Sequence, residues 1–397
     1  MYQLNQIKTN NPEPWNITFA RRNQYLEESL KGGSKICILL YERADNSTFR
    51  YRGYNLWQST LGESEWKCVY FFFNELECIE NRLLKVHLLS LTRIRWTKEL
   101  DYVVKKVKAN GIPVIFDVDD LIYDLDFLAE ITNVLNVNSS ELDYDFWTAV
   151  IGRIGMTASL ATGFTTTNHF LGTKLQKKFG NPYAIIPNYL NNEQVDVSNI
   201  YHAEKRKQNS LQPFTIGYFS GTPTHIIDFN MVKEELISFL LKYEHSHLMV
   251  VGYMDFPDDM APLLEKKRIS FTPFVDFITL QHLIAQVDVN IAPLATSTFA
   301  NCKSELKFFE AAIVDTVTLA SPTYTFAKAI ENGETGFLCK PGNWYETLEK
   351  IYAKEVDVNR INEKAREYVL THYYGKKMNQ QICSSYNELT NNISAHY

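Results

Sequence analysis

The chain has 397 residues, which is too long for one compact core and predicts two domains. Hydrophobic residues make up 45% of the sequence and aromatic residues 13%, a composition that builds packed cores and excludes an intrinsically disordered protein. Forty Lys and Arg residues face 46 Asp and Glu residues, which gives a net charge of −6. This balance argues against a nucleic-acid partner, because nucleic-acid-binding proteins need a basic face to neutralise phosphates.

The cysteines and the apolar stretches exclude further classes of protein. The six cysteines are scattered without a C-x-x-C pair, so neither a zinc ribbon nor a disulfide framework is expected. Residues 1–19 are polar and lack the apolar core of a signal peptide. No stretch approaches the ~18 to 20 apolar residues of a membrane-spanning helix. We therefore expect a cytoplasmic protein, with peripheral contact at the inner face of a membrane left open.

Short apolar runs alternate with amphipathic stretches from Lys35 onward, which indicates alternating strands and helices. Residues 97–111 are typical of the helices, because apolar side chains recur there at helical spacing before a glycine. Alternation with short connections predicts parallel strands joined by crossover helices. The strands of the first half are predicted at residues 35–42, 67–73, 85–94, 112–119, 163–168 and 183–188.

The pattern breaks at residues 191–213, a polar stretch that we interpret as the interdomain linker. Its basic triplet, Lys205, Arg206 and Lys207, is expected in a solvated loop, with contact at a membrane surface as the alternative. Two βα halves then predict two Rossmann-like domains with parallel sheets, whose ligands bind at the carboxyl ends of the strands. The strands of the second half are predicted at residues 214–221, 247–254, 269–275, 289–294, 316–322 and 336–340.

These patterns divide the chain into four parts. Residues 1–34 form an N-terminal extension, residues 35–200 the first Rossmann-like domain and residues 201–375 the second. Residues 376–397 form a C-terminal tail that we expect to pack back on the first domain.

The second half contains two candidate anion-binding segments. In the first, a strand runs into Ser220 and Gly221 before a helix, and a glycine there lets the backbone approach a phosphate closely. A plain βα turn explains this junction equally well, and the G-x-G-x-x-G fingerprint of dinucleotide-binding proteins is absent. In the second, Lys303 and Lys307 open a helix, where cations oppose the helix dipole unless an anion neutralises them. Glu310 follows and can accept hydrogen bonds from a ribose diol; the alternative is a solvated helix.

Several segments together resemble one known family. The sequences "KSELKFFEAA" (303–312), "TVTLAS" (316–321) and "AIENGETGFL" (329–338) are similar to the carboxyl-terminal domain of family-4 (group 1) glycosyltransferases. "IPNYL" resembles their interdomain turn, and "IGYFSGTPTH", "STFRYRGYN" and "VIFDVDDLIYD" resemble a subgroup from bacterial surface-polysaccharide clusters. The resemblance covers most of the chain and implies the GT-B fold, an α/β architecture of two Rossmann-like domains with parallel sheets facing an interdomain cleft.

Carried over residue by residue, the resemblance implies a donor site in the second domain. Glu310 matches the second glutamate of the family's E-x7-E motif, which binds the nucleotide ribose. Cys302 stands where the motif has its first glutamate, so Cys302 and Glu305 are assigned to the donor sugar. The nucleoside diphosphate is assigned to Ser220, Gly221, Thr222, Phe274, Val275, Lys303, Leu306, Lys307 and Glu310. The positive side chains would stabilise the leaving diphosphate, so no metal is expected.

The first half supplies the candidate acceptor residues. Residues 45–55 are predicted as a loop, in which Arg50, Arg52 and Tyr54 suit recognition of a phosphate or a sugar. A surface loop whose arginines make ion pairs is the alternative. His169, at a predicted helix start, is a further candidate, although a histidine in that position is more often structural.

Five carboxylates follow a predicted strand in "IFDVDDLIYDLD" (115–126). "DVDDL" departs from the D-x-D-x-[TV] signature of phosphoaspartate phosphatases at Leu121, and "DDLIYD" is one residue longer than the D-D-x-x-D metal motif of prenyl synthases. We interpret Asp119 and Asp120 as catalytic residues that contact the acceptor hydroxyl or help to deprotonate it. The last two aspartates of the stretch are expected to be structural.

The favoured hypothesis is a glycosyltransferase that moves a sugar from a nucleotide sugar to a glycan or lipid-linked acceptor. We expect it to retain the sugar's configuration, to act in cell-surface polysaccharide biosynthesis, and to need no cofactor. Two alternatives stay open. One is a non-catalytic GT-B-like binding or scaffold protein, suggested by Cys302, and the other is a magnesium-dependent phosphatase centred on Asp117.

Overall fold

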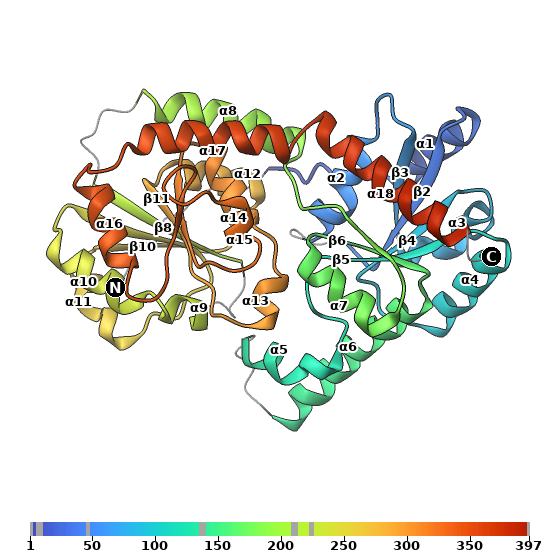
Figure 1. Ribbon diagram of the computed structural model, residues 1–397, viewed down its shortest axis with the longest axis horizontal. Helices are drawn as coiled ribbons and strands as arrows, with labels where there is room; N and C mark the ends of the chain where they lie inside the picture. Colours follow the sequence, from blue (N-terminus) through green and yellow to red (C-terminus); the bar gives the residue numbers. More distant parts are fainter. Residues whose placement is uncertain are drawn as a thin grey trace.

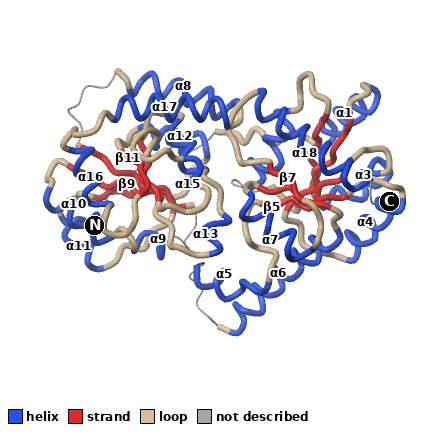
Figure 2. The backbone as a smooth tube through the Cα atoms, in the orientation of Figure 1, coloured by secondary structure: helices blue, strands red, loops and turns tan. Residues whose placement is uncertain are grey.

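The chain folds into two α/β domains that lie side by side (Figure 1). The structure is a computed structural model that describes residues 3–4, 11–44, 48–134, 140–207, 213–221 and 226–394. Figure 2 shows the strands of each domain as a separate cluster surrounded by helices. Among the described residues, no helix is long and apolar enough to cross a membrane.

The N-terminal domain is built on a six-stranded parallel sheet with the order β3-β2-β4-β5-β6-β7. Its strands are β2 (Lys35–Tyr41), β3 (Trp66–Phe72), β4 (Leu88–Thr92), β5 (Val114–Val118), β6 (Gly163–Thr166) and β7 (Tyr183–Ile185). Its helices are α1 (Phe19–Lys31), α2 (Asn55–Ser59), α3 (Leu76–Leu83), α4 (Lys98–Ala109), α5 (Leu128–Val134), α6 (Glu141–Leu160) and α7 (His169–Phe179). Strands β4 and β5 are buried throughout, as the inner strands of a doubly covered parallel sheet must be.

The C-terminal domain has a seven-stranded parallel sheet with the order β1-β10-β9-β8-β11-β12-β13. Its strands are β1 (Gln3–Leu4), β8 (Phe214–Ser220), β9 (Ser246–Gly252), β10 (Ile269–Thr272), β11 (Val289–Ala292), β12 (Val317–Ala320) and β13 (Phe337–Leu338). The helices from the linker onward are α8 (Asn192–Lys205), α9 (Ile226–Asn230), α10 (Lys233–Lys242), α11 (Ala261–Glu265), α12 (Phe277–Ala285), α13 (Thr298–Cys302), α14 (Leu306–Ala312), α15 (Phe326–Ala329), α16 (Trp344–Tyr352), α17 (Val358–His372) and α18 (Lys376–Ser394).

Segments near the two ends of the chain pack on the opposite domains. Strand β1 pairs in parallel with β10 of the C-terminal domain, and α1 then packs against β3 of the N-terminal domain. At the other end, α18 crosses from α17 to the N-terminal domain, where it packs on β7 and α2 (Figure 1). Tyr386 of α18 lies edge-on to Trp66, with ring centroids 5.3 Å apart. The two domains are therefore tied together at both ends as well as by the linker.

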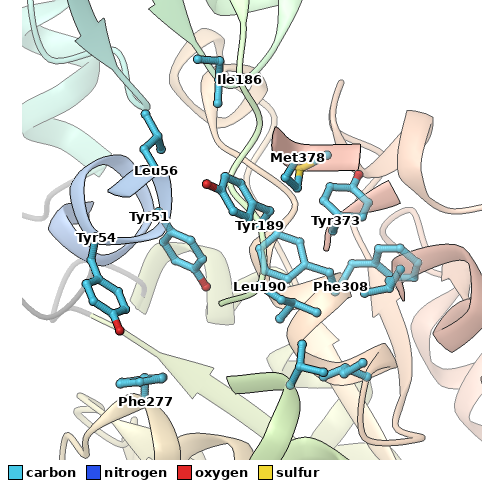
Figure 3. Packing of buried hydrophobic residues seen from close by; sticks show 14 of the residues in the cluster. Tyr51, Tyr54, Leu56, Ile186, Tyr189, Leu190, Phe277, Phe308, Tyr373 and Met378 are labelled. Atoms are coloured by element: carbon cyan, nitrogen blue, oxygen red, sulfur yellow. The ribbon is translucent and has the colours of Figure 1, made fainter. Parts of the chain in front are cut away.

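The chain just before the linker, at Tyr189 and Leu190, meets the α17–α18 junction at Tyr373, and we call this meeting point the hinge. The backbone N–H of Leu190 donates to the carbonyl oxygen of Tyr373 at 2.9 Å. Tyr189 and Leu190, just before the linker, pack with Phe308 and Tyr373 in one buried apolar cluster that contains residues from both domains (Figure 3). Because this cluster continues across the hinge, the domains share a core rather than only a surface contact.

The segment after β2, predicted as a loop, is helical from Thr48 to Ser59 and includes a wide π-helical turn at Arg50–Tyr54. The first residues of that predicted loop, 45–47, lie outside the described residues. Both arginines of the segment are buried rather than solvated. The prediction failed because alternating Arg and Tyr residues have no helical apolar period, although their long side chains are packed here.

The predicted interdomain linker is also largely helical, because it forms α8, which packs against α12. Asn191 caps the helix by accepting from the N–H of Gln194. The amino group of Lys205 donates to the carbonyl oxygen of Val287 and to the hydroxyl of Thr316, both at 2.7 Å. Lys205 is therefore an anchor of the helix and not part of a solvated basic loop.

Candidate functional site

A cleft of about 500 Å³ lies between the two domains, at the carboxyl ends of several strands of both sheets. Residues from the N-terminal domain form one wall and residues from the C-terminal domain form the other. The lining contains Thr48, Arg50, Tyr51, Arg93, Asp119, Asp120, Phe219, Ser220, Gly221, Val251, Gly252, Phe274, Val275, Phe277, Leu280, Leu294, Lys303, Ser304, Leu306, Lys307, Glu310 and Phe326. This is the place where the structure gathers most of the predicted donor residues.

Glu310, on α14, is 3% exposed and is held by three groups from two parts of the fold. Its Oε1 atom accepts hydrogen bonds from the Tyr51 hydroxyl at 2.6 Å and from Arg50 Nη2 at 3.0 Å, both on the N-terminal domain. Gln194 Nε2, in the first turn of α8, lies 3.4 Å from the same oxygen. No described residue donates a hydrogen bond to Oε2. One oxygen of a buried carboxylate is thus satisfied, and the other is available to a ligand.

Arg50 lies between two aromatic rings at the edge of the cleft. Its guanidinium carbon is 4.3 Å from the centroid of the Tyr51 ring and 4.7 Å from that of Phe277. Its Nε and Nη1 atoms are buried without a hydrogen-bond partner among the described residues. Burial raises the pKa of Tyr51 well above its usual value, so its hydroxyl keeps the proton that it donates to Glu310.

Lys307 contributes a buried cation to the same cleft. Its amino nitrogen has no hydrogen-bond partner within the part of the chain that the structure describes, and it lies 5.5 Å from the centroid of the Tyr218 ring. Burial lowers the pKa of Lys307 to about 8, partly offset by the nearby Asp228 carboxylate. A buried ammonium group without a hydrogen-bond acceptor is unfavourable, so this position favours binding of an anion.

Lys303 forms an ion pair with a residue on the opposite wall of the cleft. Its amino group lies 3.3 Å from Oδ2 of Asp120, on the N-terminal domain, and 4.3 Å from the centroid of the Phe299 ring. Two predicted residues from opposite walls, one assigned to the diphosphate and one to the acceptor, are therefore paired with each other. This ion pair therefore joins the two walls of the cleft.

At the ends of β8 and β9, the cleft is lined by small residues and by apolar side chains. Ser220 and Gly221 lie at the end of β8 and line the cleft beside Val251 and Gly252 at the end of β9. Gly252 has φ +108°, and a Cβ atom there would lie 1.7 Å from the carbonyl oxygen of Ser220, so no other residue fits. Phe274 and Val275 line the same cleft, and Phe274 is 45% exposed. Thr222, also predicted here, lies outside the described residues.

The acidic stretch after β5 is divided among several roles. Asp119 and Asp120 both line the cleft, and Asp119 pairs with Arg93 at 3.1 Å. Arg93 in turn donates to the Thr48 hydroxyl at 2.6 Å. Asp124 caps the next helical turn, and Asp124 and Asp126 both form ion pairs with Lys178 of α7. Within the described residues, no group of three or more His, Cys, Asp and Glu side chains is arranged to hold a metal ion.

Arg52 was predicted to contact the acceptor, but the structure buries it away from the cleft. Its Nε and Nη2 atoms donate to the two carboxylate oxygens of Asp117 at 2.9 and 2.6 Å, and Nη1 donates to the carbonyl oxygen of Ile186 at 2.5 Å. Asp117 also accepts from the Thr165 hydroxyl at 2.6 Å. Because both carboxylate oxygens are buried and hydrogen-bonded, Asp117 cannot act as the exposed nucleophile of a phosphatase.

Four further candidates do not reach the cleft. The Tyr54 hydroxyl donates to Glu193 at 2.6 Å, at the start of α8. Glu305, predicted to contact the donor sugar, is buried and accepts from the Tyr373 hydroxyl at 2.5 Å. Burial raises the pKa of Glu305, which the hydrogen bond from Tyr373 partly opposes. These two residues hold the hinge region together.

His169 and Cys302 also lie apart from the cleft lining. His169 is exposed on α7, with Nδ1 3.3 Å from the Tyr183 hydroxyl. Cys302 has a buried side chain, and burial raises the pKa of its thiol. Its carbonyl oxygen accepts a hydrogen bond from Asn168 Nδ2 at 2.9 Å, so the position helps to join the two domains. A sulfur atom buried in this way does not offer a polar contact to a sugar.

Sequence reasoning missed several residues of the cleft. Tyr51 and Thr48 lie in the segment that was predicted as a loop, where only the neighbouring arginines and Tyr54 were selected. Arg93 follows β4 directly and has φ +49°, an uncommon conformation for a residue other than glycine. Its position after a buried strand was a usable signal, because side chains there point to the ligand edge of a parallel sheet. Phe277 had no such signal, since an apolar residue at a helix start is normally part of the core.

Comparison with known families supports an assignment for the C-terminal domain. Residues 215–353 match the family model described as glycosyl transferases group 1. This segment contains Ser220, Phe274, Lys307 and Glu310, which all line the cleft. A search of the curated proteins found no match to the chain.

Solved structures with the same architecture confirm the predicted GT-B fold. HepE from Anabaena in complex with UDP is 13% identical with a TM-score of 0.59, over 89% of this chain and 100% of that chain. HepE in complex with UDP-glucose is 14% identical with a TM-score of 0.54, over the same shares. A glycosyltransferase from Rickettsia africae is 14% identical with a TM-score of 0.59, over 91% of this chain and 100% of that chain. Identities this low show the common fold.

Proposed function

We propose that this protein, a glycosyltransferase whose C-terminal domain belongs to group 1, transfers a sugar from a nucleotide sugar to an acceptor in the interdomain cleft. The observation that carries the proposal is the buried Lys307 ammonium, which lacks a hydrogen-bond acceptor among the described residues and lies in the same cleft as Glu310. A nucleoside diphosphate supplies both the anion that Lys307 needs and the ribose hydroxyls that a carboxylate binds. The UDP and UDP-glucose complexes of the structurally similar HepE support this choice of ligand.

The chemistry proposed for the donor is stabilisation of the leaving group. As the glycosidic bond breaks, the departing diphosphate gains negative charge, and a positive side chain in a site with little water offsets that charge strongly. Lys307 and Lys303 are assigned this role, with the backbone at Ser220 and Gly221 against the same phosphates. The apolar side chains of Phe274 and Val275 are assigned to the nucleobase. Because the lysines neutralise the charge, the proposal requires no metal ion.

The acceptor is assigned to the N-terminal wall. Asp119 and Asp120 line the cleft there and are proposed to bind the acceptor hydroxyl and to help remove its proton. The structure pairs Asp120 with Lys303 at 3.3 Å, so the diphosphate would draw Lys303 away and leave Asp120 for the acceptor. Retention of configuration, a glycan or lipid-linked acceptor and a role in surface polysaccharides are parts of the proposal that rest on the resemblance alone. Contact with a membrane was suggested by the basic triplet at 205–207, of which Lys205 is hydrogen-bonded within the fold.

A screen of nucleotide sugars tests the proposal. The purified chain is incubated with UDP-, GDP-, ADP- and dTDP-sugars, and release of the nucleoside diphosphate is measured. We expect slow hydrolysis of one donor, reduced at least about tenfold in Lys307→Met, because one buried charge interaction is lost. Lys340→Met, at an exposed lysine that does not line the cleft, is the matched control and should behave as wild type.

The result also separates the alternatives. If the chain binds a nucleoside diphosphate but consumes none of the nucleotide sugars, with or without added oligosaccharide acceptors, it is a binding protein and the transferase proposal is wrong. If a donor is consumed, proton NMR of the released or transferred sugar gives its anomeric configuration, and inversion would contradict the proposed retention.

A further inference from the structure

The carboxylate of Glu310 is oriented by the opposite domain. Three donors converge on its Oε1 atom: the Tyr51 hydroxyl at 2.6 Å, Arg50 Nη2 at 3.0 Å and Gln194 Nε2 at 3.4 Å. Arg50 Nη2 also donates to the Tyr51 hydroxyl at 2.9 Å, so the donors support one another. The side chains of Arg50 and Glu310 are 5% and 4% exposed. Such donors offset the hydration that a buried carboxylate loses.

The surroundings of this cluster hold it in one arrangement. The Arg50 guanidinium is fixed between the Tyr51 and Phe277 rings, at 4.3 and 4.7 Å from their centroids. Gln194 also donates to Gln281 Oε1 at 3.2 Å, and Gln281 Nε2 donates to the backbone oxygen of Glu310 at 3.1 Å. Both the side chain and the backbone of Glu310 are therefore tied to α8, and through Arg50 and Tyr51 to the N-terminal domain.

We infer that Arg50 and Tyr51 are positioning residues of the donor site, which hold Glu310 so that only its Oε2 atom is presented to the ribose. The inference rests on the proposed function, because it assigns the ribose to Glu310. It moves Arg50 from the acceptor to the donor, and it makes nucleotide affinity depend on the closed arrangement of the two domains. Because three protein donors occupy Oε1, the ribose hydroxyls can bind only at Oε2, whose lone pairs remain available.

A role at the ribose and a role at the diphosphate predict different ligand dependence. A residue that acts through Glu310 changes the affinity for a nucleoside and for its diphosphate by the same factor. A residue that contacts phosphate changes only the affinity for the diphosphate. Lys307 is the internal reference for the second behaviour, because it is assigned to the diphosphate.

The experiment compares wild type, Tyr51→Phe, Arg50→Met and Lys307→Met. Calorimetry gives the affinities for UDP, GDP and ADP, and displacement of the bound diphosphate gives the affinity for the nucleoside with the same base. Tyr51→Phe removes a single hydroxyl and keeps the ring, so it serves even if Arg50→Met fails to fold. We expect Tyr51→Phe and Arg50→Met to weaken nucleoside and diphosphate equally, by about tenfold or more, since each removes a charge-assisted hydrogen bond. Lys307→Met should weaken the diphosphate alone.

A second arm tests the single free oxygen with the 2′-deoxy and 3′-deoxy forms of the diphosphate that binds best. Wild type should lose affinity for at least one of the two, and Tyr51→Phe should show a smaller loss, because its ribose contact is already weakened. The inference is overturned if wild type binds both deoxy forms as well as the parent diphosphate. It is also overturned if Tyr51→Phe and Arg50→Met bind more tightly, lose affinity for the diphosphate alone, or show unchanged affinities. A wild-type chain that binds none of the three diphosphates refutes the proposed function itself, which is a different outcome.

Discussion

Lys307 shows for a single residue how burial makes binding of an anion favourable. Its amino group is removed from water, and the pKa falls to about 8 because burial disfavours the charged form. Within the described residues it has an aromatic face at 5.5 Å but no hydrogen-bond acceptor. A bound diphosphate would restore the charged form and raise this pKa again. Affinity and protonation at this residue are therefore linked.

This linkage predicts a pH dependence of nucleotide binding. Below about pH 8 Lys307 is protonated and attracts the diphosphate, and as pH rises through about 8 the free protein loses that charge. The affinity for a nucleoside diphosphate should therefore fall between pH 7 and pH 9 in wild type. In Lys307→Met the affinity should be lower at pH 7 and nearly flat over the same range. Calorimetry at several pH values in one ionic strength checks this, and a wild-type affinity that rises with pH would contradict the assignment.

Arg52 and Asp117 form the buried ion pair whose role is structural. Removing one partner leaves the other charge buried and unpaired, so Arg52→Met should lower the free energy of unfolding by about 3–5 kcal/mol. The double variant Arg52→Met/Asp117→Leu removes both charges and should recover much of that loss. Urea unfolding of the two variants and wild type gives the comparison. If Arg52→Met keeps full stability while acceptor use is lost, Arg52 belongs to the site after all.

Part of the candidate site could be predicted from the sequence. Ser220, Lys307 and Glu310 were selected for charge or backbone access, and all three line the cleft. Arg52 and Glu305 were selected by the same criteria but point away from it. The side chain of a residue on a short helix can face the cleft or the core, and a shift of one residue decides which. The charge of a residue does not show which of the two it faces, because a charged side chain can be buried in the core when it forms an ion pair.

At the scale of elements, the parallel strands were predictable because each is a short apolar run next to an amphipathic helix. The failures were the helix at 48–59 and α8, in which polar side chains are buried. In α8, for example, Gln194 and Ser198 are fully buried and serve as hydrogen-bonding partners of Gln281. A helix that buries polar groups has no clear apolar face, so its period is not visible in the sequence.

Helix α18 is an element whose contribution to stability can be measured. Its buried Tyr386 packs edge-on to Trp66 of β3, with the ring centroids 5.3 Å apart. These two residues are far apart in the sequence. Tyr386→Ala creates a cavity at this contact and should lower the free energy of unfolding by about 3–5 kcal/mol. Tyr386→Phe keeps the ring and is the matched control, with a change within about 1 kcal/mol. Urea unfolding monitored by tryptophan fluorescence checks both, and equal stabilities would show that α18 does not support the N-terminal domain.

At the scale of the molecule, the two domains meet through a shared apolar hinge and through polar contacts across the cleft. The Arg50–Glu310 and Lys303–Asp120 pairs each join one domain to the other. Each of these pairs contains one residue assigned to the donor and one residue on the N-terminal wall. Donor binding, closure and access of the acceptor to Asp120 are therefore parts of a single equilibrium in this account.

We propose that both domains build one donor site around Glu310 and Lys307, and a crystal structure with a bound nucleoside diphosphate would test this. We expect a ribose hydroxyl within hydrogen-bond distance of Glu310 Oε2, with Oε1 still accepting hydrogen bonds from Tyr51 and Arg50. We also expect the diphosphate against Lys307 and the Ser220–Gly221 turn. A nucleotide bound elsewhere would show that Glu310 and Lys307 do not form the donor site. So would a nucleotide in the cleft that leaves Glu310 in contact with protein groups alone.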